Sequence, residues 1–313
     1  MERDFNQIVW DDQLAEDVRK LIALAISEDL DTLGDITTQA LVPEHASGKA
    51  VMHSRQAGVV AGLVAIPTIA EIVDSRLQWE PILHDGNTIG EGRTPMGIIT
   101  GPVASILTTE RKILNLVARL CGIATLTKCY INEIVGTNAR IYDTRKTTLG
   151  WRRLEKYAVQ CGGGKSHRTG LFDAILIKDN HLAFGASDDA GACGRYRYTP
   201  AQAVRKAREW CNRYARESMQ NLPPLIEIEV DSLEQLADVL PESPDIVMLD
   251  NMTPERIREA VAMRNTLGVP TELEASGGVN LHTVRAIAET GVERISVGAL
   301  THSAISLDIG LDY

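Results

Sequence analysis

The chain has 313 residues, of which 44% are hydrophobic and 24% are charged. These fractions are those of a globular protein, and the length predicts two domains rather than one. The formal net charge is −10, and only 4% of the residues are aromatic. Nucleic acids and anionic membranes are bound through basic and stacking side chains, so we expect neither as a partner.

The cysteines and the N-terminus predict a reduced protein of the cytoplasm. The five cysteines are odd in number, widely spaced and never arranged as C-x-x-C, which argues against a disulfide framework and against a zinc site. The first residues, MERDFNQIVWDD, are polar and acidic, unlike a signal or transit peptide. No apolar run approaches the roughly 18 residues that cross a bilayer, so we expect no membrane contact.

The first third of the chain predicts a small domain of helices and strands. Apolar residues recur at helical spacing over 14–26, which indicates an amphipathic helix. Residues 48–101 alternate short valine- and isoleucine-rich runs with glycine turns, which is typical of an antiparallel sheet, and one helix is expected over 66–73. A second helical stretch, 107–120, follows.

From residue 139 onward, short apolar strands alternate with helices. Helix starts are well marked, because Thr199 and Ser232 each begin a capping box and Pro254 occupies a first helical position. Repeated strand–helix units predict a parallel sheet, and six of them favour an irregular or incomplete barrel over an open, doubly wound sheet. The predicted strands are 139–142, 174–177, 225–230, 246–249, 272–275 and 294–297. Two stretches, 185–198 and 217–224, are expected to be surface loops.

The residues that end these strands indicate an active site. In a parallel barrel all strand C-termini meet at one rim, so the side chains that follow the strands converge there. Any one of them could be an ordinary solvated residue, but six strands in succession end in charged groups or glycine turns. In chain order these are Asp143-Thr144-Arg145-Lys146, Lys178-Asp179-Asn180, Glu229 with Asp231, Asp250-Asn251, Ser276-Gly277-Gly278 and Gly298.

Positive charge is concentrated in one segment. Residues 140–168 contain eight Lys or Arg against two acids, in a chain that is acidic overall. Arg145, Lys146, His167 and Arg168 flank strands or a glycine turn and are the expected ligands, whereas the cations on the intervening helix are expected to face solvent. Arginine binds carboxylate or phosphate through two parallel hydrogen bonds, and lysine adds a point charge. The segment therefore predicts a site for a small ligand with several anionic groups.

Two glycine turns and two carboxylates complete the predicted site. The turns, at 276–278 and 298–299, each follow a late strand and precede a helix, which is the arrangement of a phosphate site in barrels. Glu229 and Asp250 end adjacent strands. They could bind a magnesium ion that accompanies a diphosphate, stabilise positive charge on a reacting sugar, or form structural ion pairs.

Several of these segments resemble the quinolinate phosphoribosyltransferase family. They are DTRKTTLGWRRLEKYAV, GGGKSHRTGLFDAILIKDNH, EIEVDSLEQL, IVMLDN, EASGGVN and ISVGALTHSAISLDIGL, with EDLDTLGDITT and RQAGVVAG similar to the family's N-terminal domain. The resemblance implies an N-terminal α/β sandwich domain over 1–118, completed by 302–313, and an irregular seven-stranded α/β barrel over 119–301. It also implies a homodimer with shared active sites, phosphoribosyl pyrophosphate as co-substrate, Mg²⁺ as its companion ion, and no organic cofactor.

The resemblance assigns roles to individual residues by matching motifs. The implied catalytic residues are Lys146, Glu229 and Asp250, the last two also as metal ligands, directly or through water and diphosphate. Arg111 matches the arginine that the family donates across the dimer. The other implied substrate-binding residues are Thr144, Arg145, His167, Arg168, Lys178, Ser276, Gly277, Gly278, Val297, Gly298 and Ala299. The family usually has proline where this chain has Leu149, which bears on loop rigidity and leaves the chemistry alone.

The implied reaction joins quinolinate to phosphoribosyl pyrophosphate and releases diphosphate and CO₂, giving nicotinate mononucleotide for NAD biosynthesis. Two alternatives stay open. A paralogue of the same fold could act on another pyridine or anion, such as a nicotinate phosphoribosyltransferase or the related protein encoded beside molybdate transporters. The barrel could also be a non-catalytic anion-binding module, although Glu229 and Asp250 argue against that, because a pure anion binder gains nothing from carboxylates.

Overall fold

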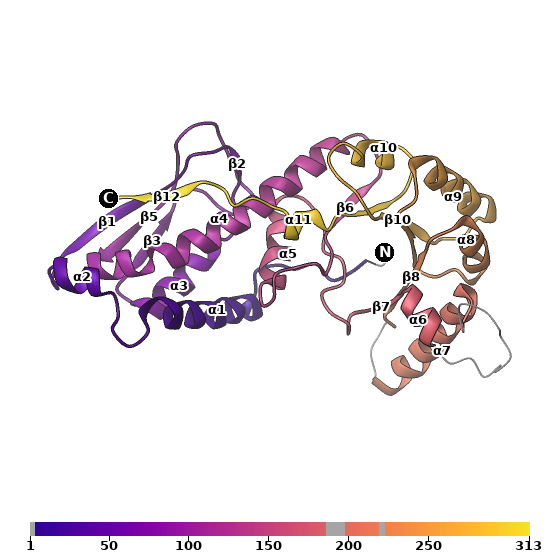
Figure 1. Ribbon diagram of the computed structural model, residues 1–313, viewed down its shortest axis with the longest axis horizontal. Helices are drawn as coiled ribbons and strands as arrows, with labels where there is room; N and C mark the ends of the chain where they lie inside the picture. Colours follow the sequence, from indigo (N-terminus) through magenta and orange to yellow (C-terminus); the bar gives the residue numbers. More distant parts are fainter. Residues whose placement is uncertain (1–3, 186–197, 219–222) are drawn as a thin grey trace. The chain divides into compact units, whose positions relative to one another are not determined.

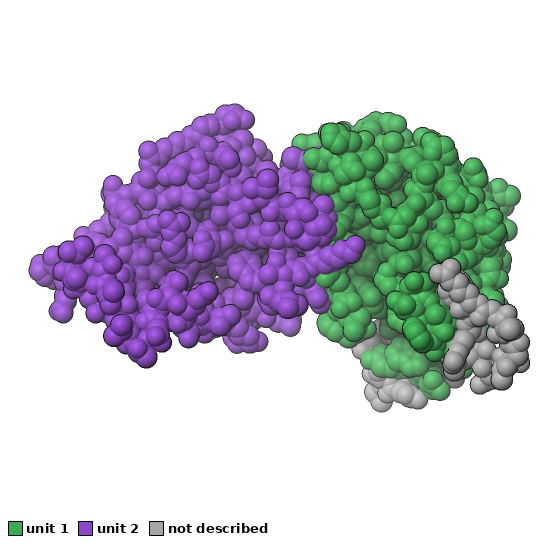
Figure 2. Space-filling view, viewed as in Figure 1, with its two compact units in different colours: residues 1–7, 130–145, 166–298 green, residues 8–129, 146–165, 299–313 purple. Residues whose placement is uncertain are grey.

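A computed structural model describes residues 4–185, 198–218 and 223–313. The two predicted surface loops therefore lie largely outside the described residues. The chain forms two compact units, which Figure 2 colours separately. Unit 1 holds residues 1–7, 130–145 and 166–298, and unit 2 holds residues 8–129, 146–165 and 299–313.

Unit 2 is built on an antiparallel sheet, as its glycine-separated runs predict. Its strands are β1 (Ser47–Ser54), β2 (Gly58–Val59), β3 (Gln78–Pro81), β4 (Thr88–Ile89), β5 (Thr94–Pro102) and β12 (Ile309–Asp312). The main sheet has the order β12-β1-β5-β3, so a strand from the C-terminal segment pairs with β1. The strands β2 and β4 form a separate antiparallel pair.

Helices lie along one side of this sheet (Figure 1), and they bury apolar residues. α1 (Asp12–Leu30) buries Leu14, Val18 and Ile22, and the side chain of its N-cap residue, Asp11, accepts a hydrogen bond from the Leu14 N–H. This confirms the predicted helix over 14–26, and α3 (Ile66–Val73) confirms the next one. The other helices of unit 2 are α2 (Ile36–Leu41), the 3₁₀ turn η1 (Leu63–Ala65), α5 (Arg152–Cys161), α11 (Ala299–His302) and most of α4 (Val103–Glu133).

α4 extends well beyond the predicted stretch of 107–120 at both ends. Its residues Ile106, Ile113 and Leu114 line a small apolar space together with Met52 and Ile99 of the sheet. Contrary to the expectation from the sequence, α4 contains a stretch long and apolar enough to cross a membrane. Since 61% of that stretch is buried inside the protein, its apolar character is that of a core helix.

Unit 1 is built on six parallel strands, each within one residue of its predicted bounds. They are β6 (Arg140–Tyr142), β7 (Ala174–Ile177), β8 (Leu225–Val230), β9 (Ile246–Asp250), β10 (Glu272–Ser276) and β11 (Arg294–Ser296). Their order is β6-β11-β10-β9-β8-β7, so the first strand pairs with the last and the others follow in cyclic order. The sheet is therefore a barrel interrupted between β6 and β7, which confirms the predicted α/β class. Among the described residues it has six strands, one fewer than the family resemblance implies.

Helices lie outside this curved sheet (Figure 1). They are α6 (Asp179–Phe184), α7 (Pro200–Ser218), α8 (Leu233–Val239), the 3₁₀ turn η2 (Leu240–Glu242), α9 (Pro254–Leu267) and α10 (Val284–Ala288). The predicted caps are present. The Thr199 N–H donates to the Gln202 side chain at 3.0 Å, and the Gln202 N–H donates to the Thr199 hydroxyl at 3.3 Å. The side chains of Ser232 and Thr253 each accept a hydrogen bond from the N–H of the residue three positions later. Capping side chains of this kind satisfy N–H groups that have no partner within the helix.

The strands turn polar side chains toward the inside of the barrel. Residues two apart in a strand share a face. In β8, Ile226 and Ile228 are buried on one face, whereas Glu227 and Glu229 share the other with Leu225. The interior of the barrel therefore contains charged groups at the level of Glu227, and the next layer up, at Glu229, forms the rim.

Candidate active site

Three of the predicted site residues meet where β7, β8 and β9 end. Lys178 directly follows β7, and its ammonium group forms an ion pair with Glu229. Asp250 ends β9 and lines, with Glu229, a cavity of about 90 Å³ to which Asp179 and Asp231 also contribute. The structure thus brings Lys178, Glu229 and Asp250 together at one rim, as parallel strand ends require.

The glycine turn after β10 lies beside Asp250. Ser276 pairs with Asp250 in the register of the sheet, and its carbonyl accepts a hydrogen bond from the Asn251 N–H at 2.8 Å. Gly277 and Gly278 have φ angles of 92° and 63°. A Cβ on Gly277 would lie 2.9 Å from the Asn251 backbone nitrogen, so both the conformation and the space require glycine. The turn therefore leaves backbone N–H groups that a phosphate could approach closely.

A second turn follows β11. Val297 donates its N–H to the Tyr142 carbonyl at 2.9 Å, which extends the pairing of β11 with β6 by one residue. Gly298 ends unit 1, and Ala299 begins α11 in unit 2.

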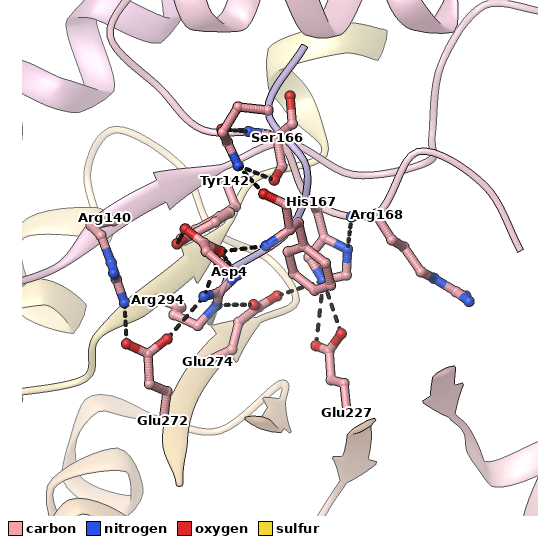
Figure 3. A network of polar contacts seen from close by, with 12 residues as sticks. Asp4, Arg140, Tyr142, Ser166, His167, Arg168, Glu227, Glu272, Glu274 and Arg294 are labelled. Atoms are coloured by element: carbon pink, nitrogen blue, oxygen red, sulfur yellow. Dashed lines mark hydrogen bonds and ion pairs between the residues drawn. The ribbon is translucent and has the colours of Figure 1, made fainter. Parts of the chain in front are cut away.

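His167 lies inside the barrel rather than at the rim (Figure 3). Its Nε2 is 3.1 Å from a carboxylate oxygen of Glu227 and 3.4 Å from one of Glu274, and both carboxylates are fully buried. Burial alone lowers the pKa of a histidine, but these two carboxylates outweigh it and raise the pKa of His167 to about 10. Its Nδ1 is 2.8 Å from the Arg168 nitrogen, a contact that favours a neutral ring. Burial, which outweighs the opposing charge of His167, raises the pKa of Glu227, whereas the pKa of Glu274 is lowered, so the charge of Glu274 is the one that most favours the protonated ring.

A buried arginine binds Glu274 and two further carboxylates. Arg294 is fully buried; its Nε is 3.1 Å from Glu274, and its terminal nitrogens are 2.9 Å from Glu272 and 3.0 Å from Asp4. Its guanidinium carbon lies 3.8 Å from the centre of the Tyr142 ring. Burial raises the pKa of a carboxyl group, yet His167 and Arg294 lower that of Glu274, so Glu274 is ionised at neutral pH.

Arg168 and Arg145 lie close enough to affect each other. Burial and then the nearby charge of Arg145 lower the pKa of Arg168. Arg168 is only 7% exposed, donates to the Ala174 carbonyl at 3.3 Å, and reaches the wall of a cavity of about 570 Å³ beside β7. Thr144 and Arg145 are half-buried and follow Asp143, whose carboxylate accepts the His167 N–H at 2.9 Å. Two neighbouring guanidinium groups of this kind favour an anionic ligand.

Lys146 and Arg111 belong to unit 2. The Lys146 side chain is exposed, and its backbone carbonyl accepts a hydrogen bond from the Thr301 hydroxyl at 2.7 Å. Two residues on, the N–H and hydroxyl of Thr148 donate to the fully buried carboxylate of Glu155 at 3.1 and 2.9 Å. Arg111 is exposed on α4 and has no ion pair within the described part of the chain.

Two groups of side chains could hold a metal ion. Glu229 and Asp250 share a small space with other carboxylates, and oxygen ligands of this kind suit Mg²⁺. His167, Glu227 and Glu274 also bring their ligand atoms within 4.8 Å of one another. A divalent ion there would face the Arg294 guanidinium that already binds Glu274, so the pair at the strand ends fits Mg²⁺ better.

Family models match nearly the whole chain. The C-terminal domain model of quinolinate phosphoribosyl transferase matches residues 123–312, and the N-terminal domain model matches residues 35–121. The chain belongs to the quinolinate phosphoribosyltransferase family.

Relatives of known name agree with this assignment. The nicotinate-nucleotide pyrophosphorylase [carboxylating] of Mycobacterium leprae is 42% identical over 299 residues, which cover 94% of this chain and 96% of the relative. The tobacco quinolinate phosphoribosyltransferase [decarboxylating] 1b is 36% identical over 310 residues, which cover 94% of this chain and 82% of the relative. The solved structure of the nicotinate-nucleotide pyrophosphorylase from Francisella tularensis superimposes with a TM-score of 0.85 at 34% identity, covering 99% of each chain.

Sequence reasoning missed the charged interior of this quinolinate phosphoribosyltransferase barrel. The residues concerned are Asp4, Glu227, Glu272, Glu274 and Arg294. A signal was present: glutamates alternate with apolar residues in EIEV and ELEA, both inside strands whose two faces had to be buried. Alternation of this kind predicts carboxylates on the inner face of a barrel, which in turn require buried cations.

The raised pKa of His167 predicts a pH-dependent loss of stability. A folded-state pKa of about 10, above the usual value of 6.5, means that the contribution is fully present below pH 6.5 and is lost as the pH rises toward 10. The difference in unfolding free energy between wild type and His167→Gln should therefore shrink by about 2–5 kcal/mol between pH 6 and pH 10. Urea unfolding at both pH values measures this difference, and the exposed His45→Gln serves as the control. An equal difference in unfolding free energy at pH 6 and pH 10 would contradict the raised pKa of His167.

Proposed function

We propose that this chain transfers the phosphoribosyl group of phosphoribosyl pyrophosphate to the ring nitrogen of quinolinate, releasing diphosphate and CO₂. The product is nicotinate mononucleotide, used in NAD biosynthesis. The observation that carries the proposal is the meeting of Lys178, Glu229 and Asp250 at one rim of the barrel, in a family whose M. leprae member is a nicotinate-nucleotide pyrophosphorylase [carboxylating]. Arg145 and Arg168 add positive charge, and cations of this kind suit quinolinate, which has two carboxylates.

In this proposal, binding sets the geometry of the reaction. Arg145 and Arg168 bind the ring carboxylates, with Thr144, Lys146 and Lys178 as further ligands, whereas His167, predicted as a ligand, is engaged by Glu227 and Glu274 inside the barrel. The turns at 276–278 and 297–299 bind the 5′-phosphate of the sugar through backbone N–H groups. Holding both substrates in a reactive orientation can supply up to about 7–11 kcal/mol of the barrier.

The chemistry then needs few protein groups. The bond between the ring nitrogen and the anomeric carbon forms as the bond from that carbon to diphosphate breaks, and the electron pair leaves with the diphosphate. Glu229 and Asp250 stabilise positive charge that develops on the sugar in between. Alkylation makes the ring cationic. When the 2-carboxylate departs as CO₂, the electron pair of the broken bond therefore stays on the ring carbon, which then takes up a proton.

Magnesium is the proposed companion ion of phosphoribosyl pyrophosphate. Glu229 and Asp250 would hold it, since their carboxylates already line one small space. When bound, the ion neutralises charge on the departing diphosphate. Lys178, now paired with Glu229, is positioned to exchange that partner for a substrate anion.

We further propose a homodimer in the cytoplasm. Arg111 is exposed on α4 and would enter the active site of the partner subunit, so that each site is built from both subunits. A reducing compartment agrees with the free thiols of four of the five cysteines, Cys121, Cys129, Cys161 and Cys211. Cys193 lies outside the described residues.

Loss of Arg168 should selectively impair the use of quinolinate. Arg168→Ala removes a charge-assisted contact worth about 1.5–3 kcal/mol, which corresponds to roughly a 10- to 150-fold fall in kcat/KM. Nicotinate, with one carboxylate, should be a far poorer substrate for the wild type, because the cations meant for the second carboxylate stay unpaired. Release of labelled CO₂ from carboxyl-labelled quinolinate, and formation of nicotinate mononucleotide from nicotinate, measure the two reactions.

The control is Arg205→Ala, which removes an exposed arginine paired with Glu242 on the helical surface of unit 1. It should keep wild-type efficiency. Equal turnover of quinolinate and nicotinate by the wild type would favour a nicotinate-type paralogue, and no turnover of either acid would favour a non-catalytic module.

Arg111 and Lys146 should complement each other between subunits. Arg111→Ala and Lys146→Ala chains should each be inactive alone. In a mixed dimer one site then carries both lesions and the other carries neither, so equal mixing should restore about one quarter of wild-type activity. Activity is measured after subunit exchange, with mixed dimers counted by native mass spectrometry. Mixed dimers without recovered activity would place Arg111 in its own subunit's site or in none.

A further inference from the structure

Side chains hold the backbone of the segment that carries Arg168. Residues 166–169 belong to no helix or strand, so their N–H groups have no regular partners. Three of these four N–H groups donate to side chains from elsewhere in unit 1. The Ser166 N–H donates to Gln7 Oε1 at 2.9 Å, and the His167 N–H donates to Asp143 Oδ1 at 2.9 Å. The Thr169 N–H donates to Asp173 Oδ2 at 2.7 Å. The place of this segment is therefore set by the side chains that bind it.

Gln7 holds Ser166 from a position 159 residues away in the sequence. Its amide nitrogen donates to the Ser166 carbonyl at 3.2 Å, and its amide oxygen accepts the Ser166 N–H at 2.9 Å. The same nitrogen donates to the Phe5 carbonyl at 2.8 Å. One side chain thus binds both backbone groups of a fully buried residue that lies two positions before Arg168.

Residues 4–7, here called the brace segment, are anchored in unit 1 through Asp4 and Phe5 (Figure 3 shows Asp4). The Asp4 carboxylate accepts hydrogen bonds of 3.0 Å from Arg294 and 2.9 Å from the Tyr142 hydroxyl. The Phe5 ring is 5% exposed, and its centre lies 4.3 Å from that of the His167 ring. The brace segment therefore links the buried ions of the barrel to the segment that carries Arg168.

We propose that the brace segment is a positioning element for substrate binding, acting through Gln7. Gln7 fixes the Ser166 backbone, and through it the place of Arg168 two residues on. The inference rests on the proposed function, in which Arg168 binds a quinolinate carboxylate. Gln7 belongs to none of the motifs that match the ligand-binding residues of the family, and its part is to hold the backbone from which a ligand projects.

The test compares Gln7→Ala with Gln39→Ala. Gln39 also donates to a backbone carbonyl, that of Leu33, but is exposed in unit 2. Gln7→Ala loses two hydrogen bonds to Ser166, so the KM for quinolinate should rise by about 5- to 30-fold, while the KM for phosphoribosyl pyrophosphate changes by less than about 2-fold. Hydrogen–deuterium exchange of peptides covering residues 166–169 should accelerate in Gln7→Ala alone.

Three results would overturn the proposal. They are unchanged exchange over 166–169, an unchanged KM for quinolinate, and an equal rise in both KM values, which would indicate a general structural defect. A wild-type protein inactive toward quinolinate would instead refute the proposed function. The exchange measurement would then still decide whether Gln7 fixes the segment.

Discussion

Arg294 places a full positive charge inside unit 1, where its side chain is entirely shielded from solvent. A charge in such a place is tolerated only when it is paired and hydrogen-bonded. Its partners are Asp4, Glu272 and Glu274, and Glu274 in turn lies against His167. Because Arg294 joins Asp4, Glu272 and Glu274, and Glu274 also contacts His167, the strands, the brace segment and the segment around His167 depend on one another.

This interior arrangement separates two tasks within one barrel. At the level of Glu227 and Glu274, charges are paired with one another and fix the backbone. One layer higher, Glu229 and Asp250 face a cavity and can exchange partners when an anion or a metal ion binds. Because the paired charges in the barrel interior fix the backbone, the ligand site at the rim has the pre-organisation that binding and catalysis both need.

The sequence is sufficient to predict the elements and the chemistry of the rim. The bounds of the barrel strands are predicted within one residue, because glycine turns and helix caps separate these apolar runs so clearly. Residues that end parallel strands must meet at one rim, so the sequence alone groups Lys178, Glu229 and Asp250. Roles that depend on a second subunit or a ligand, such as that of Arg111, stay predictions.

What the sequence does not reveal depends on contacts between distant segments. Nothing near Asp4 or Gln7 indicates that they lie inside a barrel whose first strand begins at Arg140. The neighbours of His167 in the chain place it among the predicted ligands, whereas its surroundings are set by Glu227 and Glu274, which come from two other strands. The predicted helix within α4 is too short, because buried residues continue past Leu120 at Cys121, Ile123, Ala124 and Tyr130.

The most direct test of the central claim is a double-mutant cycle between Arg294 and Glu274, measured as unfolding free energy in urea. Arg294→Met and Glu274→Gln should each destabilise the protein by about 3–5 kcal/mol, because each removes a direct partner of a fully buried charge. The double variant should lose at least about 2 kcal/mol less than the sum of the two, since the partners are in direct contact. Additive losses, with no coupling between the two positions, would contradict the account.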